Sequence, residues 1–140
     1  MNHIAIVYWS GTGNTEQMAH AVADGAKGAG AKVELISAGE FSPIQMDSFD
    51  AIAFGCPAMG TEVLEEEEFA PMFSACEEKL SGKPIALFGS YGWGDGEWMR
   101  TWEEECLAKG ARLVCHWVIC QDAPDEEASE QCRRLGAALA

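Results

Sequence analysis

Five short apolar segments alternate along the chain with longer segments in which hydrophobic residues are more widely spaced. Most of the short segments are almost continuously apolar, which is typical of strands buried on both faces of a parallel sheet. One of them is interrupted by Glu34, and this favours a position at the edge of the sheet. The pattern predicts strands over residues 4–9, 33–36, 51–55, 85–89 and 113–120.

The longer segments carry hydrophobic residues at helical spacing. Trp98 and Trp102 illustrate this, because they fall on one face of a helix and are therefore interpreted as core residues. The pattern predicts helices over residues 14–27, 97–109 and 126–139.

Two further segments have a less regular helical pattern. A helix is predicted over residues 64–80, with a late start or a kink, because it opens with the acidic run 65–68 and contains Pro71. One short helix is expected within residues 38–49, which contain Pro43.

The alternation of strands and helices places the chain in the α/β class. Crossovers between parallel strands are right-handed, so the predicted fold is a doubly wound five-stranded parallel sheet with helices on both faces. The length of 140 residues fits a single domain spanning residues 1–140. Ligands of such sheets bind at the carboxyl ends of the strands, so the loops after the first, third and fourth strands are the candidate site.

The chain is strongly acidic, with 23 Asp and Glu against 9 Lys and Arg and a net charge of −14. This charge repels nucleic acid and anionic membranes, so we expect a basic partner. The six cysteines form no CxxC pair and have no histidine at metal-ligand spacing, so reduced core thiols and no metal site are expected. The N-terminus lacks the features of a secretory signal, and no apolar run reaches about 18 residues, so we expect a cytoplasmic protein.

The loop after the first strand has the composition of a phosphate-binding turn. Two glycines allow a tight bend, and the following helix start offers unpaired N–H groups. It is not a nucleoside-triphosphate loop, because no Lys or Arg precedes Lys27, and Glu16 prevents a GxGxxG match. The residues of the loop, all uncharged, are Ser10, Gly11, Thr12, Gly13, Asn14 and Thr15.

The other two loops contain features that suit a planar ligand. After the third strand, Gly60 occupies a position typical of a turn with positive φ, next to Met59. After the fourth strand, aromatic residues alternate with glycines, and Trp93 lies between two of these glycines. Such an indole has little core to join, so we expect a planar ring to lie against it.

These three loops, in this order, resemble those of the flavodoxins, specifically the short-chain type of clostridia and rumen anaerobes. The resemblance runs nearly end to end and depends most on residues 8–15 (YWSGTGNT) and 89–94 (GSYGWG). It implies a flavodoxin-like sheet with strand order 2-1-3-4-5, non-covalently bound FMN and a role in electron transport.

The resemblance also implies roles for individual residues. Residues 10–15 would hold the FMN phosphate, assisted by Ser90, while Trp93 and Met59 would cover the outer and inner faces of the isoalloxazine. The residues expected to bind FMN are Ser10, Gly11, Thr12, Gly13, Asn14, Thr15, Pro57, Ala58, Met59, Gly60, Thr61, Glu62, Ser90, Tyr91, Gly92, Trp93, Gly94 and Asp122.

At the pyrimidine end of the flavin, the resemblance assigns backbone N–H groups to Gly92 and Gly94 and a hydrogen bond from N(3)–H to Glu62. Two positions depart from the family pattern. Pro57 stands where some relatives carry a hydroxyl residue that reaches the phosphate, and Thr61 occupies a variable position beside the turning peptide. The sequence does not determine how these two residues change the FMN affinity and the redox potential.

As an electron carrier of this type, the protein would shuttle one electron between the semiquinone and the hydroquinone at low potential. The redox-tuning residues would be Met59, Gly60, Thr61 and Trp93, with the Gly60 carbonyl turning toward flavin N(5)–H. The partners would be redox proteins with basic docking surfaces, such as ferredoxin-type oxidoreductases, which would meet Glu62 and residues 65–68. A monomer is expected.

Two other readings stay open at this point. An FMN-dependent quinone or NAD(P)H oxidoreductase of the same fold would need a pocket beside the flavin for a second substrate, and 140 residues leave little chain for it. A phosphatase would need a cysteine six positions before an arginine in a phosphate loop; Cys106 and Arg112 have this spacing but lie outside the candidate loop. A receiver-type acidic pocket is unsupported, because the first strand ends in no Asp pair.

Overall fold

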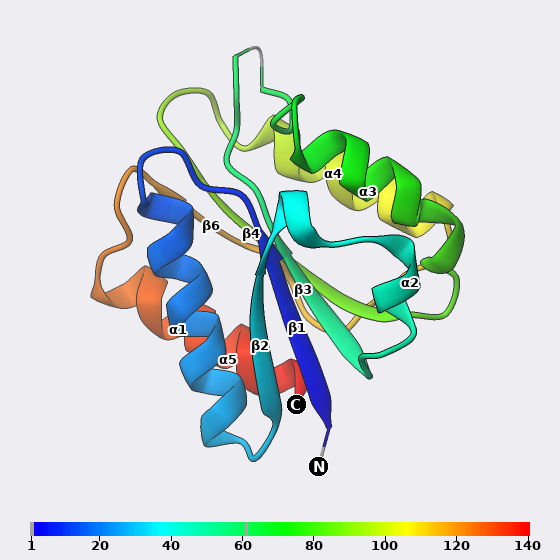
Figure 1. The fold of residues 1–140 in the computed structure, drawn as a ribbon. Helices are drawn as coiled ribbons and strands as arrows, with labels where there is room; N and C mark the ends of the chain where they lie inside the picture. Colours follow the sequence, from blue (N-terminus) through cyan, green and yellow to red (C-terminus); the bar gives the residue numbers. More distant parts are fainter. Residues whose placement is uncertain (1, 61) are drawn as a thin grey trace.

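The computed structural model describes residues 2–60 and 62–140 and has a parallel sheet at its centre. The strands follow the spatial order β2-β1-β3-β4-β5, with β6 also paired to β4 (Figure 1). This is the predicted doubly wound order, and β2 lies at the edge as expected. The strands are β1 (His3–Tyr8), β2 (Lys32–Ser37), β3 (Ala51–Gly55), β4 (Pro84–Tyr91), β5 (Arg112–Leu113) and β6 (Val118–Gln121).

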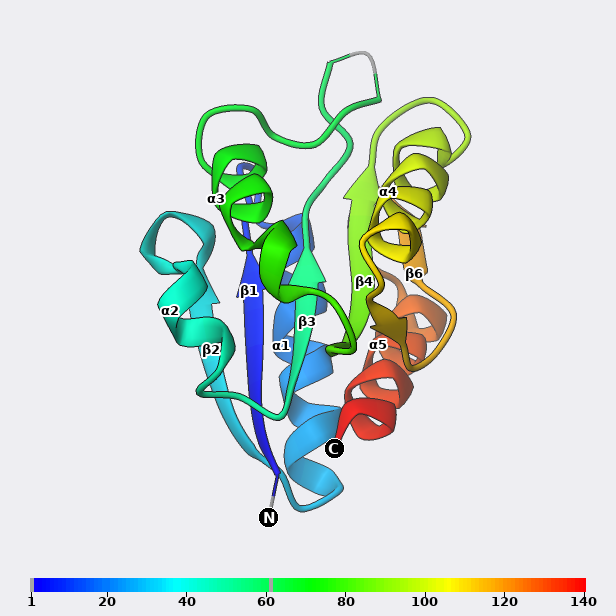
Figure 2. The same ribbon diagram turned by 90° about the vertical axis from the view of Figure 1, so that its right-hand side faces the viewer.

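Helices cover both faces of the sheet (Figure 2). The helices α1 and α5 pack on one face, and α3 and α4 pack on the other. The predicted Trp98 and Trp102 are indeed buried, in the core between the sheet and the second pair of helices. The helices are α1 (Asn14–Gly28), α2 (Pro43–Met46), α3 (Phe69–Cys76), α4 (Glu97–Ala108) and α5 (Glu126–Leu139).

The prediction of one continuous strand over residues 113–120 is wrong. The register pairs Ile85 with Leu113 and Phe88 with Val118, so three steps along β4 correspond to five steps along the neighbouring chain. Two extra residues must therefore leave the ladder, as in a bulge, and β5 and β6 are separate. Trp117, within this break, packs against the core under α3 and α4.

The weak segment between β2 and β3 contains a helix, as expected. It begins with the 3₁₀ turn η1 (Ala38–Glu40), and the one-turn helix α2 follows. Pro43 occupies the first turn of α2, where its missing N–H costs nothing, and Gln45 Oε1 accepts from the Ser42 N–H at 2.9 Å.

The helix predicted over residues 64–80 begins late, at Phe69, and its last turn is the 3₁₀ turn η2 (Glu77–Lys79). The cause is Glu65, which is 5% exposed and whose carboxylate accepts from the backbone N–H groups of Glu67, Glu68 and Phe69, each at 2.8 Å. These are orphan donors at the helix start. Glu65 is thus a buried cap, and its expected place in an exposed docking run is wrong.

The six cysteines are all free thiols, and four of them are buried; Cys115 and Cys120 are half-buried. Within the described residues, no group of His, Cys, Asp and Glu side chains is arranged to hold a metal ion. None of the helices that the structure describes is both long enough and apolar enough to span a lipid bilayer.

Glu65 gives a pH-dependent prediction for stability. Burial alone would raise the pKa of its carboxyl. The three backbone hydrogen bonds together lower the pKa by more than burial raises it, so the pKa lies below its usual range. The ionised cap therefore stabilises the fold above the unfolded-state pKa, and this contribution is lost as the pH falls through the folded-state pKa. We expect Glu65→Gln to lower the free energy of unfolding by about 1 kcal/mol and Glu65→Ala by about 1–3 kcal/mol at neutral pH.

Urea denaturation of the wild type and the two variants, repeated from neutral to acidic pH, measures this effect. The difference in the free energy of unfolding between the wild type and Glu65→Gln should become smaller at acidic pH. The exposed neighbour provides the control, because Glu66→Gln should change stability by less than about 0.5 kcal/mol. A difference for Glu65→Gln that stays constant across the pH range would contradict the role of the ionised cap.

Candidate functional site

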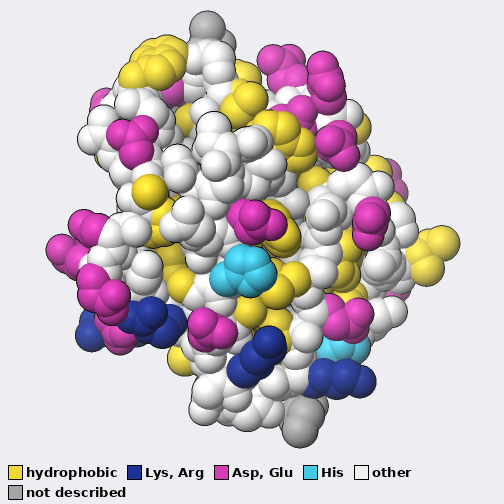
Figure 3. Space-filling model, turned by 60° about the vertical axis from the view of Figure 1, so that its left-hand side comes forward, with side chains coloured by type: hydrophobic (Ala, Val, Ile, Leu, Met, Phe, Trp, Pro, Cys, Tyr) yellow, Lys and Arg dark blue, Asp and Glu magenta, His cyan; other side chains and the backbone are white. Residues whose placement is uncertain are grey.

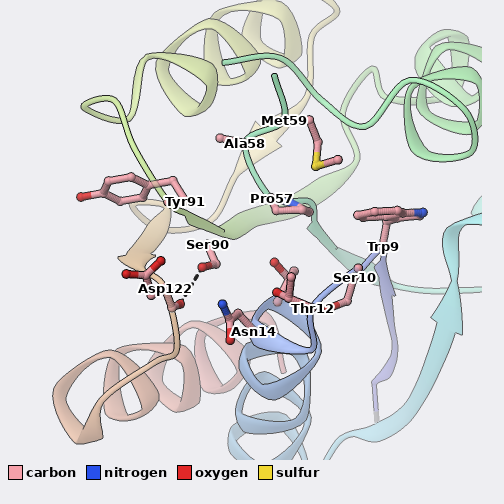
Figure 4. Close-up of a pocket in the computed structure, with 13 residues that line it drawn as sticks. Trp9, Ser10, Thr12, Asn14, Pro57, Ala58, Met59, Ser90, Tyr91 and Asp122 are labelled. Atoms are coloured by element: carbon pink, nitrogen blue, oxygen red, sulfur yellow. Dashed lines mark hydrogen bonds between the residues drawn. The ribbon is translucent and has the colours of Figure 1, made fainter. Parts of the chain in front are cut away.

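A pocket of about 220 Å³ lies at the carboxyl edge of the sheet, where the loops after β1, β3, β4 and β6 meet. Figure 4 shows Trp9 and Tyr91 on opposite sides of it, with the Met59 sulfur directed toward its centre. One part of the lining is apolar and the other carries hydroxyl and amide groups. The lining residues are Trp9, Ser10, Gly11, Thr12, Asn14, Thr15, Pro57, Ala58, Met59, Ser90, Tyr91, Gly92 and Asp122.

The loop before α1 is shaped by Ser10 and Gly13. Ser10 Oγ accepts from the N–H groups of Gly13 (3.1 Å) and Glu16 (3.2 Å), which fixes the bend and satisfies two donors near the helix start. Gly13 has φ of +96°, a conformation that favours glycine. Because Ser10 Oγ acts as acceptor in both bonds, its own O–H remains available as a donor.

Thr15 carries the most informative polar group of the pocket. The residue is 1% exposed, and its Oγ1 has no hydrogen-bond partner among the described residues. A buried hydroxyl without a partner costs stability. It lies in the first turn of α1, where backbone N–H groups and the helix dipole favour an anion. The arrangement suits a ligand with phosphate oxygens.

The opposite side of the pocket is held by a link between β4 and the loop after β6. Buried Ser90 donates its O–H to the Asp122 carbonyl at 2.6 Å, and the Asp122 N–H donates to the Tyr91 carbonyl at 2.8 Å. Asp122 has φ of +58°, which is uncommon for a residue other than glycine. Ser90 therefore also joins two loops of the site, in addition to lining the pocket.

The loop after β3 forms a narrow hairpin beside the pocket. Met59 and Val63 exchange two backbone hydrogen bonds, of 2.8 and 3.0 Å, and Gly60 lies between them with φ of +51°. An added Cβ at Gly60 would meet no atom within 4 Å among the described residues beyond its chain neighbours, so backbone conformation, and not a lack of space, favours glycine there. Thr61, which the sequence assigned to redox tuning, lies outside the described residues.

Glu62 connects this hairpin to the loop after β4. Its Oε1 accepts from the Asp95 N–H at 3.1 Å, and a Cβ at Gly94 would collide with the same oxygen. The adjacent Trp93 is 63% exposed. An indole so exposed, directly after the pocket-lining Gly92, offers a flat apolar surface at the edge of the site.

The structure brings twelve of the sequence-predicted residues together in the pocket lining, from all four loops. Gly13, Gly60, Glu62, Trp93 and Gly94 border the site but do not line the pocket. Trp9 lines it although the sequence analysis, which placed this residue in the first strand and in the motif of residues 8–15, did not include it among the FMN-binding residues. Its position directly before the phosphate-type loop was the signal that could have identified it.

Two buried thiols, Cys56 beside these loops and Cys106 in the last turn of α4, are poorly suited to act as nucleophiles. Cys56, whose Sγ accepts from the Glu65 N–H at 3.3 Å, is fully buried, and burial raises its pKa strongly. Burial also raises the pKa of Cys106 to about 12, with nearby glutamates adding to the shift. Cys106 lies in α4 and Arg112 in β5, so the two residues do not share a phosphate-binding loop, and the raised pKa disfavours the thiolate that a nucleophile requires.

The charged side chains at the site are acidic, with Asp122 in the pocket lining and Glu62 at its border. Among the residues that line the pocket, the structure shows no Lys or Arg. Arg100, in the first half of α4, is paired with Asp95 at 3.1 Å. On the face drawn in Figure 3, Lys and Arg side chains lie in the lower half, away from the upper end, where the loops of the carboxyl edge lie in Figure 1. An anion in the pocket must therefore be held by neutral donors.

Comparison with known proteins identifies relatives of nearly the same length. The flavodoxin family matches residues 6–136. A flavodoxin from Clostridium beijerinckii is 47% identical over 135 residues, which cover 96% of this chain and 97% of that protein. A flavodoxin from Megasphaera elsdenii is 44% identical over 137 residues, with 98% of each chain covered.

Solved structures give the same result. The solution structure of two-electron reduced Megasphaera elsdenii flavodoxin has a TM-score of 0.90 at 43% identity and covers 97% of both chains. A flavodoxin from the domain Archaea has a TM-score of 0.87 at 25% identity, with 99% of this chain and 96% of that chain covered.

Proposed function

The chain belongs to the flavodoxin family and is an FMN-binding electron carrier, and we propose that it moves single electrons at low potential between redox proteins with basic surfaces. The unpartnered Thr15 hydroxyl at the start of α1 is the observation that supports an FMN phosphate in this pocket, because it offers a buried donor to an anion. The pocket around it contains no described cation, as expected for a phosphate held by neutral donors.

The residues of the pocket suit the two halves of FMN. The loop of residues 10–15 supplies the phosphate end with hydroxyl, amide and backbone N–H donors. Trp9, Met59 and Tyr91 supply apolar surface for the aromatic end. We propose that the exposed Trp93 covers the outer face of the ring, while Glu62, Gly92 and Gly94 contact its pyrimidine end.

FMN supplies the redox chemistry, and the protein sets the potential of each one-electron step. We propose that the working couple lies between the one-electron-reduced and the two-electron-reduced flavin. A net charge of −14 and a pocket lining without a described cation disfavour added negative charge, which lowers the potential of that couple. Gly60, at the tip of the hairpin with φ of +51°, is the proposed tuning residue.

The exposed acidic residues near the carboxyl edge of the sheet also suit the docking of a partner. Glu66 and Glu67 are exposed on the loop before α3, and Glu16 is exposed in the first turn of α1. Complementary charge speeds the encounter of electron-transfer partners and holds them weakly, so a basic partner surface fits this edge. Glu65 takes no part, because its carboxylate is buried in the cap.

The function is tested directly by the flavin. The apoprotein should bind FMN, and Thr15→Val should weaken this binding by about tenfold, because it removes one donor to a charged ligand. The same change should leave the free protein as stable as before or more stable, because it removes a buried hydroxyl without a partner. Quenching of FMN fluorescence measures the affinity, and urea denaturation of the apoprotein measures the stability.

A surface change of the same type, Thr101→Val on exposed Thr101, serves as the control and should alter neither quantity. An apoprotein that binds no FMN would refute the proposed function. A Thr15→Val protein with wild-type affinity would show that this hydroxyl is not part of the site.

Replacement of Gly60 tests the proposed couple. An alanine at this position is disfavoured by about 1–2 kcal/mol in a turn with positive φ. We therefore expect Gly60→Ala to lower the maximal yield of the one-electron-reduced flavin during anaerobic reductive titration, followed by absorbance. Gly82→Ala, at another open glycine with φ of +74°, provides the control, since it lies directly before β4 at the opposite end of that strand. Equal yields in both variants and the wild type would contradict the tuning role.

The docking proposal predicts a salt-dependent rate. With cytochrome c as a basic one-electron acceptor, electron transfer from the reduced protein should slow as ionic strength rises. At low salt, Glu66→Gln should lower the second-order rate constant by about twofold, whereas exposed Glu78 in η2 provides a matched control whose replacement by Gln should have little effect. Stopped-flow absorbance gives the rates. A rate that is independent of salt, or equal losses in both variants, would argue against docking at this edge.

A further inference from the structure

Trp9 forms one wall of the pocket, although its polar atom faces away from it. The main-chain N–H of Trp9 donates to the Gly55 carbonyl at 3.1 Å, which fixes the backbone directly after β1. The indole lies over Gly11, where an added Cβ would come within 2.9 Å of the ring. Figure 4 shows the ring at one side of the pocket, with its nitrogen directed away from the other labelled residues.

The indole N–H has a specific acceptor far away in the sequence. It donates to Glu68 Oε1 at 3.3 Å, across 59 positions of the chain. Glu68 is an exposed residue, and its carboxylate is the acceptor that the structure gives the Trp9 indole N–H. Glu68 therefore defines which way the polar edge of Trp9 points.

The backbone of Glu68 is fixed by a hydrogen bond, and its carboxylate lies close to a neighbouring segment. The Glu68 N–H donates to Oε1 of the capping Glu65 at 2.8 Å, so the backbone before α3 is fixed. The other carboxylate oxygen, Oε2, packs against Gly39 of η1, where a Cβ would collide with it. Three segments thus meet at this side chain: the end of β1, the turn η1 and the start of α3.

We propose that Glu68 is a positioning residue, whose carboxylate holds the Trp9 indole in place as a wall of the flavin pocket. The inference rests on the proposed function of that pocket. Without the acceptor, the indole N–H turns to water and the ring gains access to other rotamers. A wall that is already ordered in the free protein lowers the ordering cost of binding, so Glu68 contributes to FMN affinity without touching the pocket.

The first arm of the test needs no flavin. In a ¹H–¹⁵N spectrum of the apoprotein, each indole N–H gives its own signal, and Trp9→Phe identifies the signal of Trp9. In Glu68→Ala this signal should shift and exchange faster with water, whereas Glu68→Gln, whose amide oxygen can still accept, should restore most of the wild-type signal. Glu40→Ala, at an exposed acidic residue next to Gly39, is the matched control and should leave it unchanged.

The second arm measures FMN affinity by fluorescence quenching. Glu68→Ala should raise the Kd by about three- to tenfold, Glu68→Gln by less, and Glu40→Ala by less than about twofold. Thermal unfolding of each apoprotein shows whether the fold is retained, and Glu68→Gln carries the test if Glu68→Ala does not fold.

An unchanged Trp9 signal in Glu68→Ala would overturn the proposal. A changed signal with wild-type FMN affinity would also overturn it, because the position of the indole would then have no effect on the binding of FMN. Failure of the proposed function has a different signature, since the wild-type apoprotein itself would then leave FMN fluorescence unquenched.

Discussion

The interaction on which the proposed site depends is that of an anion with uncharged donors at the start of α1. The helix α1 follows directly from β1, so the bend that Ser10 stabilises also brings the N–H groups of the first turn to the sheet edge. The Thr15 hydroxyl is buried there without a partner, and that cost persists until a ligand accepts from it. The free protein is therefore organised for a ligand at the expense of some stability.

The acidic residues of the chain have different structural roles. Glu65 is a buried cap, Glu68 bonds an indole of the pocket wall, and Glu62 joins two loops of the site. Glu66 and Glu67 are exposed and make none of these contacts, so the proposed docking role assigns them a contribution through charge alone. A net charge of −14 consequently describes the long-range field of the molecule but not the role of any one carboxylate.

The sequence predicts those features that depend on neighbouring residues or on a regular period. The first four strands, the four long helices and the three principal loops are of this kind, because burial on both faces leaves continuous apolar runs. The order of the sheet is implied by the resemblance to flavodoxins and not by the hydrophobic period. The roles of Trp9, Glu65 and Glu68 could not be predicted in this way. Each depends on partners that only the fold brings close, as in the contact between Trp9 and Glu68. The division of the fifth strand depends on its register with β4, which apolar content does not reveal.

The arrangement separates anchoring from tuning. The phosphate-type loop and Ser90 are tied to β1 and β4, inside the sheet, and they define a rigid base for the site. The hairpin around Gly60 and the exposed Trp93 project beyond that base and meet mainly through Glu62 and Asp95. With FMN placed as proposed, a change in the hairpin would alter the surroundings of the ring without disturbing the anchor of its phosphate. An electron carrier needs this independence, because its potential must be set by the protein while its cofactor stays bound in every redox state.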